Sequence, residues 1–484
     1  MIIRKIDESF LELLNVEDSV LNSIKQLFSA YTPGYRYLYA YKTGKWDGKY
    51  YCVVGNRVPI GLLKELVAFL DENRIPYELD LKYHSRIRSV ETDYLCNVAP
   101  HDYQKEAVED ALKDRKMCVE LPTGSGKTLV EYLLVRILKN NNKKVLILVP
   151  RSNLVLQMQS DFESYGSLDL FVVKGRDKNS DARVYLTTWQ SVYKLNHEYF
   201  KQFDAVIVDE AHNAKAKELN MLITKCSNAE IKVGFSGTFG KPKTHERLMQ
   251  TSVLGPIKKY VDYERLKKMN QISEFKVIVF KLVYTMEDKK NMKHKCRGNY
   301  AKEVNYVNNN VKRNELLLNM LEVIKNNSIV LFSRKDTHGK ILFEEAKKMI
   351  NNKTLIYLDG DSSAEEREEF RNVMRDNDDV VGFVTFGIFS EGVSINNLHN
   401  VFLISSYKSR VKILQAIGRN LRTNDNKKIG KIFDIVDDFS HESIDKLSNS
   451  KDKFVNYSMI HMFQRVRLYK EMKIDFSVKE VTLK

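Results

Sequence analysis

The chain has 484 residues, of which 43% are hydrophobic, so it is too long for a single ordinary core and too apolar for a disordered chain. A formal net charge of +15 favours a polyanionic partner, because each basic side chain placed on a phosphate releases condensed counterions. The five cysteines show no paired spacing, which argues against a disulfide framework and a zinc site. No apolar run reaches membrane-spanning length, which argues against a membrane-inserted segment. Together these features favour a cytoplasmic protein.

Residues 1–92 form the first predicted domain. They lack a regular alternation of strands and helices but carry their own apolar and aromatic residues, which predicts a small α+β accessory domain. Within it, Lys45, Trp46 and Lys49 lie in a segment where basic and aromatic residues are interleaved, a pattern suited to binding a DNA backbone or a base splayed out of a duplex. A hairpin with buried aromatic residues and solvated lysines explains the pattern equally well.

Residues 93–260 form the second predicted domain, in which short apolar runs alternate with longer amphipathic ones. This rhythm is typical of buried parallel strands joined by helices. The expected strands are residues 117–121, 145–149, 184–188, 205–209 and 231–236.

A phosphate-binding loop follows the first of these strands. Residues 121–128 read Leu-Pro-Thr-Gly-Ser-Gly-Lys-Thr, with Leu121 where the strict pattern has glycine. Backbone N–H groups at a helix N-terminus surround phosphate oxygens, so we expect ATP to be held here, with Lys127 on the β- and γ-phosphates and Thr128 on a magnesium ion. The predicted ATP-binding residues of the loop are Thr123, Gly124, Ser125, Gly126, Lys127 and Thr128.

An acidic pair lies at the end of the strand expected at 205–209. A parallel sheet presents its functional side chains at the carboxyl ends of its strands, so we expect Asp209 to hold Mg²⁺ and Glu210 to orient or deprotonate the attacking water. His212, with Ser236 and Thr238 at the end of the next strand, is predicted to couple hydrolysis to the rest of the molecule.

Residues 261–445 repeat the same rhythm and form a second predicted lobe. The connection 254–273, which has Gly255-Pro256 and then a basic stretch, suits a hinge. Its expected strands are residues 277–282, 329–332, 354–358, 380–385, 401–405 and 429–435. Near its end, Gln415, Arg419 and Arg422 have the spacing of one helical stripe, and arginines placed on a γ-phosphate stabilise the charge of the transition state. Because they lie so far from the phosphate loop, we expect them to complete it only when the two lobes close. Residues 446–484 are expected to be a short, basic, helical tail.

These motifs, taken in order, resemble those of superfamily 2 helicases. The resemblance implies that Tyr103 and Gln104 contact the adenine of ATP, although His101 stands where many relatives have arginine. It also implies a set of contacts to the nucleic-acid backbone, made by Arg151, Thr188, Gln190, Ser333, Arg334 and Thr385.

Three segments narrow the resemblance to the UvsW-type branch-migration helicases of large tailed phages: Gly34-Tyr-Arg-Tyr, Lys45-Trp-Asp-Gly-Lys and 386–395. In the last of these, Ser394 stands where an acid is usual. The resemblance implies an α/β fold of two tandem RecA-like parallel-sheet lobes with the small N-terminal domain and the helical tail. It implies a monomeric, ATP- and Mg²⁺-dependent helicase acting on branched DNA, with replication or recombination proteins as further partners. A duplex translocase of a restriction or remodelling complex, an RNA helicase and a nucleotide-gated clamp remain alternatives.

Overall fold

The computed structural model describes residues 1–81, 94, 96–173, 180–269, 271, 274–296, 298–333, 338–390, 395, 397–405, 413, 416, 429–444 and 451–483. The chain divides into two compact units, Met1–Val261 and Asp262–Lys484. The first contains the accessory domain, here residues 1–81, and lobe 1, here residues 94–261. The second unit is lobe 2.

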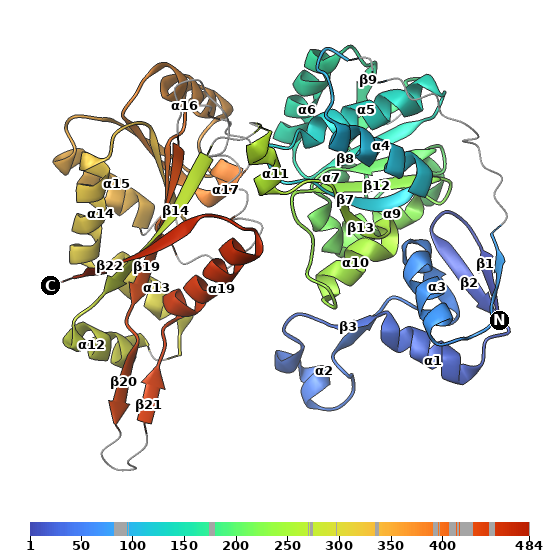
Figure 1. Ribbon diagram of the computed structural model, residues 1–484, viewed down its shortest axis with the longest axis horizontal. Helices are drawn as coiled ribbons and strands as arrows, with labels where there is room; N and C mark the ends of the chain where they lie inside the picture. Colours follow the sequence, from blue (N-terminus) through green and yellow to red (C-terminus); the bar gives the residue numbers. More distant parts are fainter. Residues whose placement is uncertain are drawn as a thin grey trace. The chain divides into compact units, whose positions relative to one another are not determined.

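The accessory domain is built on a four-stranded mixed sheet in the order β5-β2-β1-β6. In β2, Leu11 and Leu13 point into the core while the residues between them are part-exposed, which is the alternation of a half-buried strand. A separate hairpin, β3 with β4, extends from it (Figure 1). The elements are β1 (Ile2–Lys5), β2 (Phe10–Leu14), α1 (Asp18–Leu27), β3 (Ser29–Tyr31), η1 (Tyr35–Tyr37), α2 (Tyr39–Lys42), β4 (Lys49–Tyr51), β5 (Arg57–Pro59), η2 (Ile60–Leu62), α3 (Leu63–Glu72) and β6 (Glu78–Asp80).

Lobe 1 contains a seven-stranded sheet in the order β13-β7-β12-β11-β8-β10-β9, and every strand pair in it is parallel. Its central strands are buried over their whole length, so they read as continuous apolar runs. The strands are β7 (Lys116–Glu120), β8 (Val145–Val149), β9 (Leu170–Val172), β10 (Val184–Thr188), β11 (Ala205–Val208), β12 (Ile231–Ser236) and β13 (Ile257–Lys259). The helices are α4 (Asp102–Asp114), α5 (Lys127–Asn140), α6 (Ser152–Tyr165), α7 (Trp189–Val192), α8 (His197–Phe200), η3 (Ala211–Lys215), α9 (Lys217–Lys225) and α10 (His245–Leu254).

Gly255 and Pro256 are part of lobe 1, and the division between the two units lies further along, within the connection 254–273 that the sequence predicts as a hinge. Gly255 has a φ of +98°, and a Cβ atom there would meet the carbonyl oxygen of Lys116 at 2.3 Å. The carbonyl of Pro256 accepts a hydrogen bond of 2.8 Å from the N–H of Cys118. The Gly-Pro pair therefore turns the chain back onto the sheet as edge strand β13, and the division between the units falls after Val261.

Lobe 2 contains a second parallel seven-stranded sheet, in the order β16-β17-β15-β18-β19-β14-β22. Its strands are β14 (Glu274–Val283), β15 (Ser328–Phe332), β16 (Thr354–Leu358), β17 (Val380–Thr385), β18 (Asn400–Leu403), β19 (Ile429–Asp438) and β22 (Phe476–Thr482). The helices are α11 (Tyr263–Lys268), α12 (Met286–Cys296), α13 (Tyr300–Asn308), α14 (Val311–Val323), α15 (Lys340–Met349), α16 (Ala364–Asp376), α17 (Phe386–Ser390) and α19 (Tyr457–Glu471).

The C-terminal segment is more than a helical tail. The expected helix is present as α19, but β22 after it joins the sheet beside β14, and a hairpin of β20 (His441–Ile444) and β21 (Lys451–Phe454) precedes it (Figure 1). Helix α19 is anchored through Arg465, whose buried guanidinium donates to the carboxylate of Asp434 at 2.8 Å. The segment is therefore an integral part of lobe 2.

The accessory domain packs directly on lobe 1. A Cβ atom on Gly61, in η2, would lie 2.3 Å from the carbonyl oxygen of Thr251 and 2.6 Å from that of Ser252, so two backbones meet where no side chain fits. Leu248 of the same helix, α10, packs against the core of the accessory domain. The ring of Tyr50 also lies edge-on against His245 at the start of α10, 5.2 Å between centroids.

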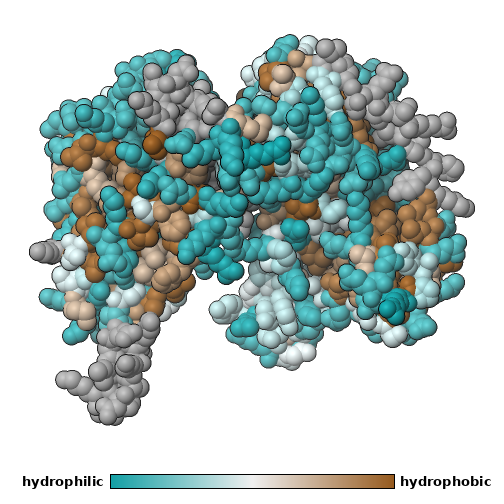
Figure 2. Space-filling view, viewed as in Figure 1, coloured by the Kyte–Doolittle hydropathy of each residue, from teal (hydrophilic) through white to brown (hydrophobic). Residues whose placement is uncertain are grey.

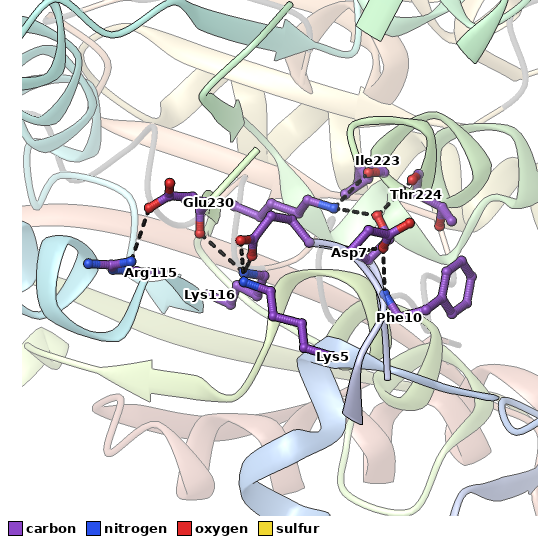
Figure 3. A network of polar contacts seen from close by, with 11 residues as sticks. Lys5, Asp7, Phe10, Arg115, Lys116, Ile223, Thr224 and Glu230 are labelled. Atoms are coloured by element: carbon purple, nitrogen blue, oxygen red, sulfur yellow. Dashed lines mark hydrogen bonds and ion pairs between the residues drawn. The ribbon is translucent and has the colours of Figure 1, made fainter. Parts of the chain in front are cut away.

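A polar network completes this interface (Figure 3). Lys116, the first residue of β7, donates to the carboxylate of Glu8 at 2.5 Å, and Lys5 also bonds to that carboxylate. Lys232, near the start of β12, is fully buried, and its amine donates to the hydroxyl of Ser9 at 2.7 Å and to a carbonyl of α9. The accessory domain is thus bonded to the amino ends of two strands of the lobe 1 sheet, β7 and β12.

Candidate active site

The phosphate loop connects β7 to α5 in the predicted strand–loop–helix context. Two of its glycines adopt conformations that other residues avoid, with φ of +90° at Gly124 and +70° at Gly126. The N–H of Leu121 donates to the carbonyl of Ser236 at 3.0 Å, which holds the start of the loop against β12. The buried hydroxyl of Ser125 has no hydrogen-bond partner among the described residues.

Tyr103 and Gln104 support this loop from α4. The hydroxyl of Tyr103 and the amide N–H of Gln104 both donate to the carbonyl of Ser125, at 2.8 and 2.9 Å. The amide oxygen of Gln104 accepts from the backbone N–H of His101 at 2.8 Å, so the side chain is bonded at both ends. The structure thus gives both residues a role in holding the loop, while their contact with adenine stays a prediction.

Lys127, Asp209 and Glu210 form an ion cluster at the carboxyl edge of the sheet. The ammonium of Lys127 donates to Asp209 at 2.5 Å and to Glu210 at 2.9 Å. Asp209 follows the last residue of β11, and Glu210 has a left-handed backbone with φ of +48°, which is costly for a residue other than glycine. Sequence positions 127, 209 and 210 are therefore brought together as expected.

The electrostatics of the cluster favour the charged forms of Lys127 and Glu210. Burial by itself disfavours the charged form of Lys127, but the carboxylates of Asp209 and Glu210 outweigh burial and raise its pKa above the usual value. Burial likewise acts to raise the pKa of Glu210, and Lys127 and His212 outweigh it and lower that pKa. Glu210 is thus a carboxylate at neutral pH, as a residue that orients water must be.

His212, Ser236 and Thr238 connect the acidic pair to the next strand. The Nδ1 atom of His212 lies 3.1 Å from the carboxylate of Glu210 and 3.1 Å from the hydroxyl of Ser236. The Ser236 hydroxyl donates in turn to the carbonyl of Thr238 at 2.8 Å. Gln250, in α10, donates to the carbonyl of His212 at 2.9 Å. The predicted coupling residues therefore form one continuous chain of polar contacts that reaches α10.

The sequence reasoning missed one further acidic residue at this site. Glu131 lies one helical turn after Lys127 in α5, is 0% exposed, and its two carboxylate oxygens lack hydrogen-bond partners among the described residues. Burial raises its pKa well above the usual value, and the negative charge of Asp209 adds to the effect. The sequence signal that could have identified Glu131 is an acid at the fourth position after the loop lysine, on an otherwise apolar helix face.

The nucleic-acid residues predicted in lobe 1 lie at the carboxyl ends of two adjacent strands. Thr188 ends β10 and pairs in register with Val149, the last residue of β8, directly before Pro150-Arg151. The amide of Gln190 donates to the carbonyl of Pro150 at 3.0 Å and joins the two segments. Arg151, Thr188 and Gln190 are thus neighbours.

Two of the residues predicted in lobe 2 are gathered in the same way. Thr385 ends β17 and pairs with Phe332, the residue before Ser333 at the end of β15. The N–H of Ser333 is bonded to the hydroxyl of Ser405, just after β18, at 3.3 Å. The remaining positions, Arg334, Ser394, Gln415, Arg419 and Arg422, lie outside the described residues.

In the accessory domain, Trp46 and Lys49 make contacts within the domain. The indole N–H of Trp46 donates to the carbonyl of Lys49 at 2.9 Å, and the ammonium of Lys49 donates to Gln26 at 2.8 Å. Lys45 is exposed. Of the three residues, Lys45 therefore presents its side chain to solvent, while the other two stabilise the segment.

Three family models match the chain. The model described as DNA helicase UvsW, N-terminal, matches residues 4–80, the model of the type III restriction enzyme res subunit matches 97–241, and the helicase conserved C-terminal domain matches 312–424. Together they cover the accessory domain and part of each seven-stranded sheet.

Relatives of known identity match nearly the whole chain. The ATP-dependent DNA helicase uvsW of Enterobacteria phage T4 is 30% identical over 498 residues, 97% of this chain and 97% of the relative. A crystal structure of T4 UvsW aligns over 100% of this chain and 99% of that chain with 28% identity and a TM-score of 0.47. The type ISP restriction-modification enzyme LlaBIII bound to DNA covers 87% of this chain and 36% of that chain, with 17% identity and a TM-score of 0.57, and shares the fold.

A phosphate loop, an acidic pair and two RecA-like sheets define an ATP hydrolase of superfamily 2. Within that superfamily, the chain belongs to the UvsW family of helicases. None of the helices within the described residues combines the length and apolarity needed to cross a membrane.

Proposed function

We propose that this protein is an ATP-dependent DNA helicase that remodels branched DNA such as forks, displacement loops and four-way junctions, in recombination, repair or replication. The ion cluster of Lys127 with Asp209 and Glu210 carries the proposal, because it assembles the phosphate-binding and water-orienting groups of an ATPase in one place. The proposed location is the cytoplasm, of the host cell where a phage encodes the protein.

The residues of the loop fit ATP and Mg²⁺. Gly124 and Gly126 have positive φ, a conformation that lets neighbouring backbone N–H groups bind an anion, and the buried hydroxyl of Ser125 has no partner among the described residues. Thr128 and Asp209 are the proposed ligands of Mg²⁺. When bound there, the ion would supply positive charge that neutralises the phosphates.

We assign the chemical steps to residues of lobe 1. Lys127 exchanges its carboxylate partners for phosphate oxygens, and Glu210 then orients the attacking water. His212 passes the resulting change in the acidic pair to Ser236 and Thr238. Gln415, Arg419 and Arg422 are proposed to stabilise the γ-phosphate in the transition state, as predicted from the sequence.

The DNA contacts are proposed at the carboxyl edges of the two sheets. Arg151, Thr188 and Gln190 would bind the backbone from lobe 1, and Ser333, Arg334 and Thr385 from lobe 2. Contacts of this kind go to phosphate and sugar, so they position DNA without reading its sequence. Residues 1–92 are proposed to select the branched substrate, with Lys45 as a backbone contact.

Strand displacement tests this function. The wild-type protein with ATP and Mg²⁺ is offered forked DNA, displacement loops, four-way junctions and RNA duplexes of matched length. We expect strand separation or branch migration on branched DNA and little on RNA. ATP hydrolysis without displacement on any of these substrates would contradict the proposal and favour a clamp.

A duplex translocase is the second candidate, because the restriction-enzyme model matches the part of lobe 1 that carries the phosphate loop. A translocase moves along uninterrupted duplex without opening it, so displacement of a bound triplex-forming strand, without fork unwinding, would identify it.

A further inference from the structure

Two tyrosines in the accessory domain are unusually exposed. Tyr37 is 83% exposed and Tyr39 is 74% exposed, and Leu38 between them is 49% exposed. They lie in η1 and α2, the pale segment at the lower edge of the first unit in Figure 2. Large rings left in solvent side by side mark a binding surface more often than a structural one. We call Tyr37, Leu38 and Tyr39 the tyrosine face.

Other aromatic residues of the same segment pack on one another. Tyr35 stacks on Tyr31 with 4.5 Å between centroids and packs edge-on against Tyr41 at 4.7 Å. Gly48 lies so close to the Tyr35 ring that a Cβ atom there would sit 2.4 Å from it. Tyr35 therefore packs between two rings, whereas Tyr37 and Tyr39 face solvent. Tyr31 and Tyr41 contact Tyr35 and are themselves 52% and 36% exposed.

The charge around the tyrosine face is strongly positive. Residues 31–50 contain Arg36, Lys42, Lys45 and Lys49 and one acidic residue, Asp47. The carboxylate of Asp47 is itself engaged, since it accepts hydrogen bonds from the hydroxyl of Tyr51 at 2.5 Å and from the N–H of Lys49 at 2.9 Å. The face thus combines exposed rings with uncompensated cations, which suits a ligand with flat faces and negative charge.

Unpaired nucleotides have both properties. A base in a continuous duplex is covered on both sides by its neighbours, so a tyrosine ring finds a free base face only where bases are unstacked. Phosphate alone would be bound by the lysines without any need for exposed rings. The rings therefore favour single-stranded or splayed bases over intact duplex.

We propose that Tyr37 and Tyr39 form a stacking site for unpaired bases at a DNA branch point. The proposal rests on the proposed function, and it specifies which feature of the substrate the accessory domain recognises. The surrounding cations, Arg36, Lys42 and Lys45, hold the adjoining phosphates.

Binding by the full chain tests the stacking site. The Tyr37→Ala/Tyr39→Ala variant is compared with wild type on a fork with unpaired bases at its branch and on an uninterrupted duplex of equal length, by fluorescence anisotropy. Because stacking on an aromatic side chain contributes about 1–3 kcal/mol per base, we expect fork affinity to fall roughly 5-fold to 150-fold while duplex affinity stays within about 2-fold. A 2-aminopurine placed at the branch should lose its protein-induced fluorescence change.

Two controls separate the ring from other effects. Tyr37→Phe/Tyr39→Phe keeps both rings and should bind the fork like wild type, whereas Phe463→Ala removes a ring that is 56% exposed in α19 and should leave fork binding unchanged. Far-UV circular dichroism checks that each variant is folded.

The outcomes distinguish this inference from the proposed function. An equal loss on fork and duplex, or no loss on either, overturns the stacking site; the second result would leave the face to a protein partner. If wild type itself neither binds branched DNA nor hydrolyses ATP in its presence, the proposed function fails instead.

Discussion

The ammonium of Lys127 bonds to two carboxylates and so holds Asp209 and Glu210 beside each other. The left-handed backbone of Glu210 adds a local cost that the surrounding contacts must offset. Strain of this kind is typical of residues whose position matters for chemistry. The side chain is held in place by Lys127 on one side and His212 on the other.

Replacing Glu210 by glutamine tests its role with little change in shape. We expect DNA-stimulated ATP hydrolysis to fall by roughly 10²- to 10⁴-fold, the usual contribution of a general base, because the amide cannot accept a proton from water. DNA binding measured by anisotropy should stay near the wild-type value. Full ATPase activity in Glu210→Gln would remove this residue from the mechanism.

Lys232 is a second unusual residue, since its buried amine contacts a hydroxyl and a carbonyl, and no carboxylate bonds to it within the described part of the chain. Burial lowers its pKa from 10.5 to about 7, with Lys116 acting in the same direction and Cys226, Asp7 and Glu8 against it. Between pH 7 and 10.5 the unfolded chain binds a proton that the folded chain does not, so the free energy of unfolding rises with pH in that window. Below pH 7 the amine is charged in both states and this pH dependence disappears.

Lys232→Met should therefore change how stability depends on pH. We expect the wild-type free energy of unfolding to increase between pH 7 and 9 relative to the variant, by up to about 1.4 kcal/mol per pH unit. Urea unfolding of both proteins at pH 7, 8 and 9 measures the difference, in which all other titrating groups cancel. Parallel curves would mean that the Lys232 amine keeps its proton throughout.

At the level of elements, the central strands and the edge strand β16 were predictable, whereas the other edge strands were not. Runs such as 145–149, 184–188 and 231–236 coincide with β8, β10 and β12 because strands buried on both faces must be continuously apolar. Strands β9 and β13 have three residues each and are largely part-exposed, and β22 is mostly exposed, so they carry no such pattern.

The candidate site was predictable to a similar extent. The residues at strand ends were found because parallel strands bring their carboxyl ends together, which applies to Asp209, Ser236 and Thr188 alike. Side chains that act through distant partners were not found. The burial of Lys232 depends on which residues surround it in the fold, and spacing along the chain does not encode that. Glu131 differs, because its position four residues after Lys127 on an apolar helix face is a signal that the sequence does contain.

Substituting Gly61 tests the close approach of η2 to α10. Gly61→Ala places a methyl group 2.3 Å from a backbone oxygen that cannot rotate away, so we expect a loss of roughly 1–3 kcal/mol in stability, as for other overpacked sites. Gly360→Ala is the matched control, since a Cβ atom there has nothing within 4 Å and should change stability by less than about 0.5 kcal/mol. Thermal melting of the three proteins provides the comparison. Equal melting temperatures would show that the interface relaxes around the added methyl group.

The whole molecule consists of two units, and the accessory domain belongs to the first of them. Removing residues 1–81 would strip Lys116 of its carboxylate partner and expose Leu248, so a deletion damages lobe 1 as well as removing a domain. Surface substitutions such as those in the tyrosine face therefore test the domain more cleanly than truncation.

Calorimetry should show this organisation. Multidomain chains commonly unfold in more than one step, so we expect two transitions, one per unit. Gly61→Ala should lower the temperature of one transition, and a lobe 2 variant such as Arg465→Met, which breaks the buried pair with Asp434, should lower the other. A third, independent transition for the accessory domain would contradict its assignment to the first unit.

The attachment of the accessory domain to Lys116 and Lys232 has a consequence for how such proteins can be recombined. These two lysines and the end of α10 are part of lobe 1 in the sequence, yet their contacts are with the accessory domain. A chimera that takes the accessory domain from one relative and lobe 1 from another would combine the two sides of these hydrogen bonds from different proteins. A functional chimera between relatives must therefore take positions 116, 232 and 248–252 from the same parent as the accessory domain. We expect these positions and the domain to have been inherited together during evolution.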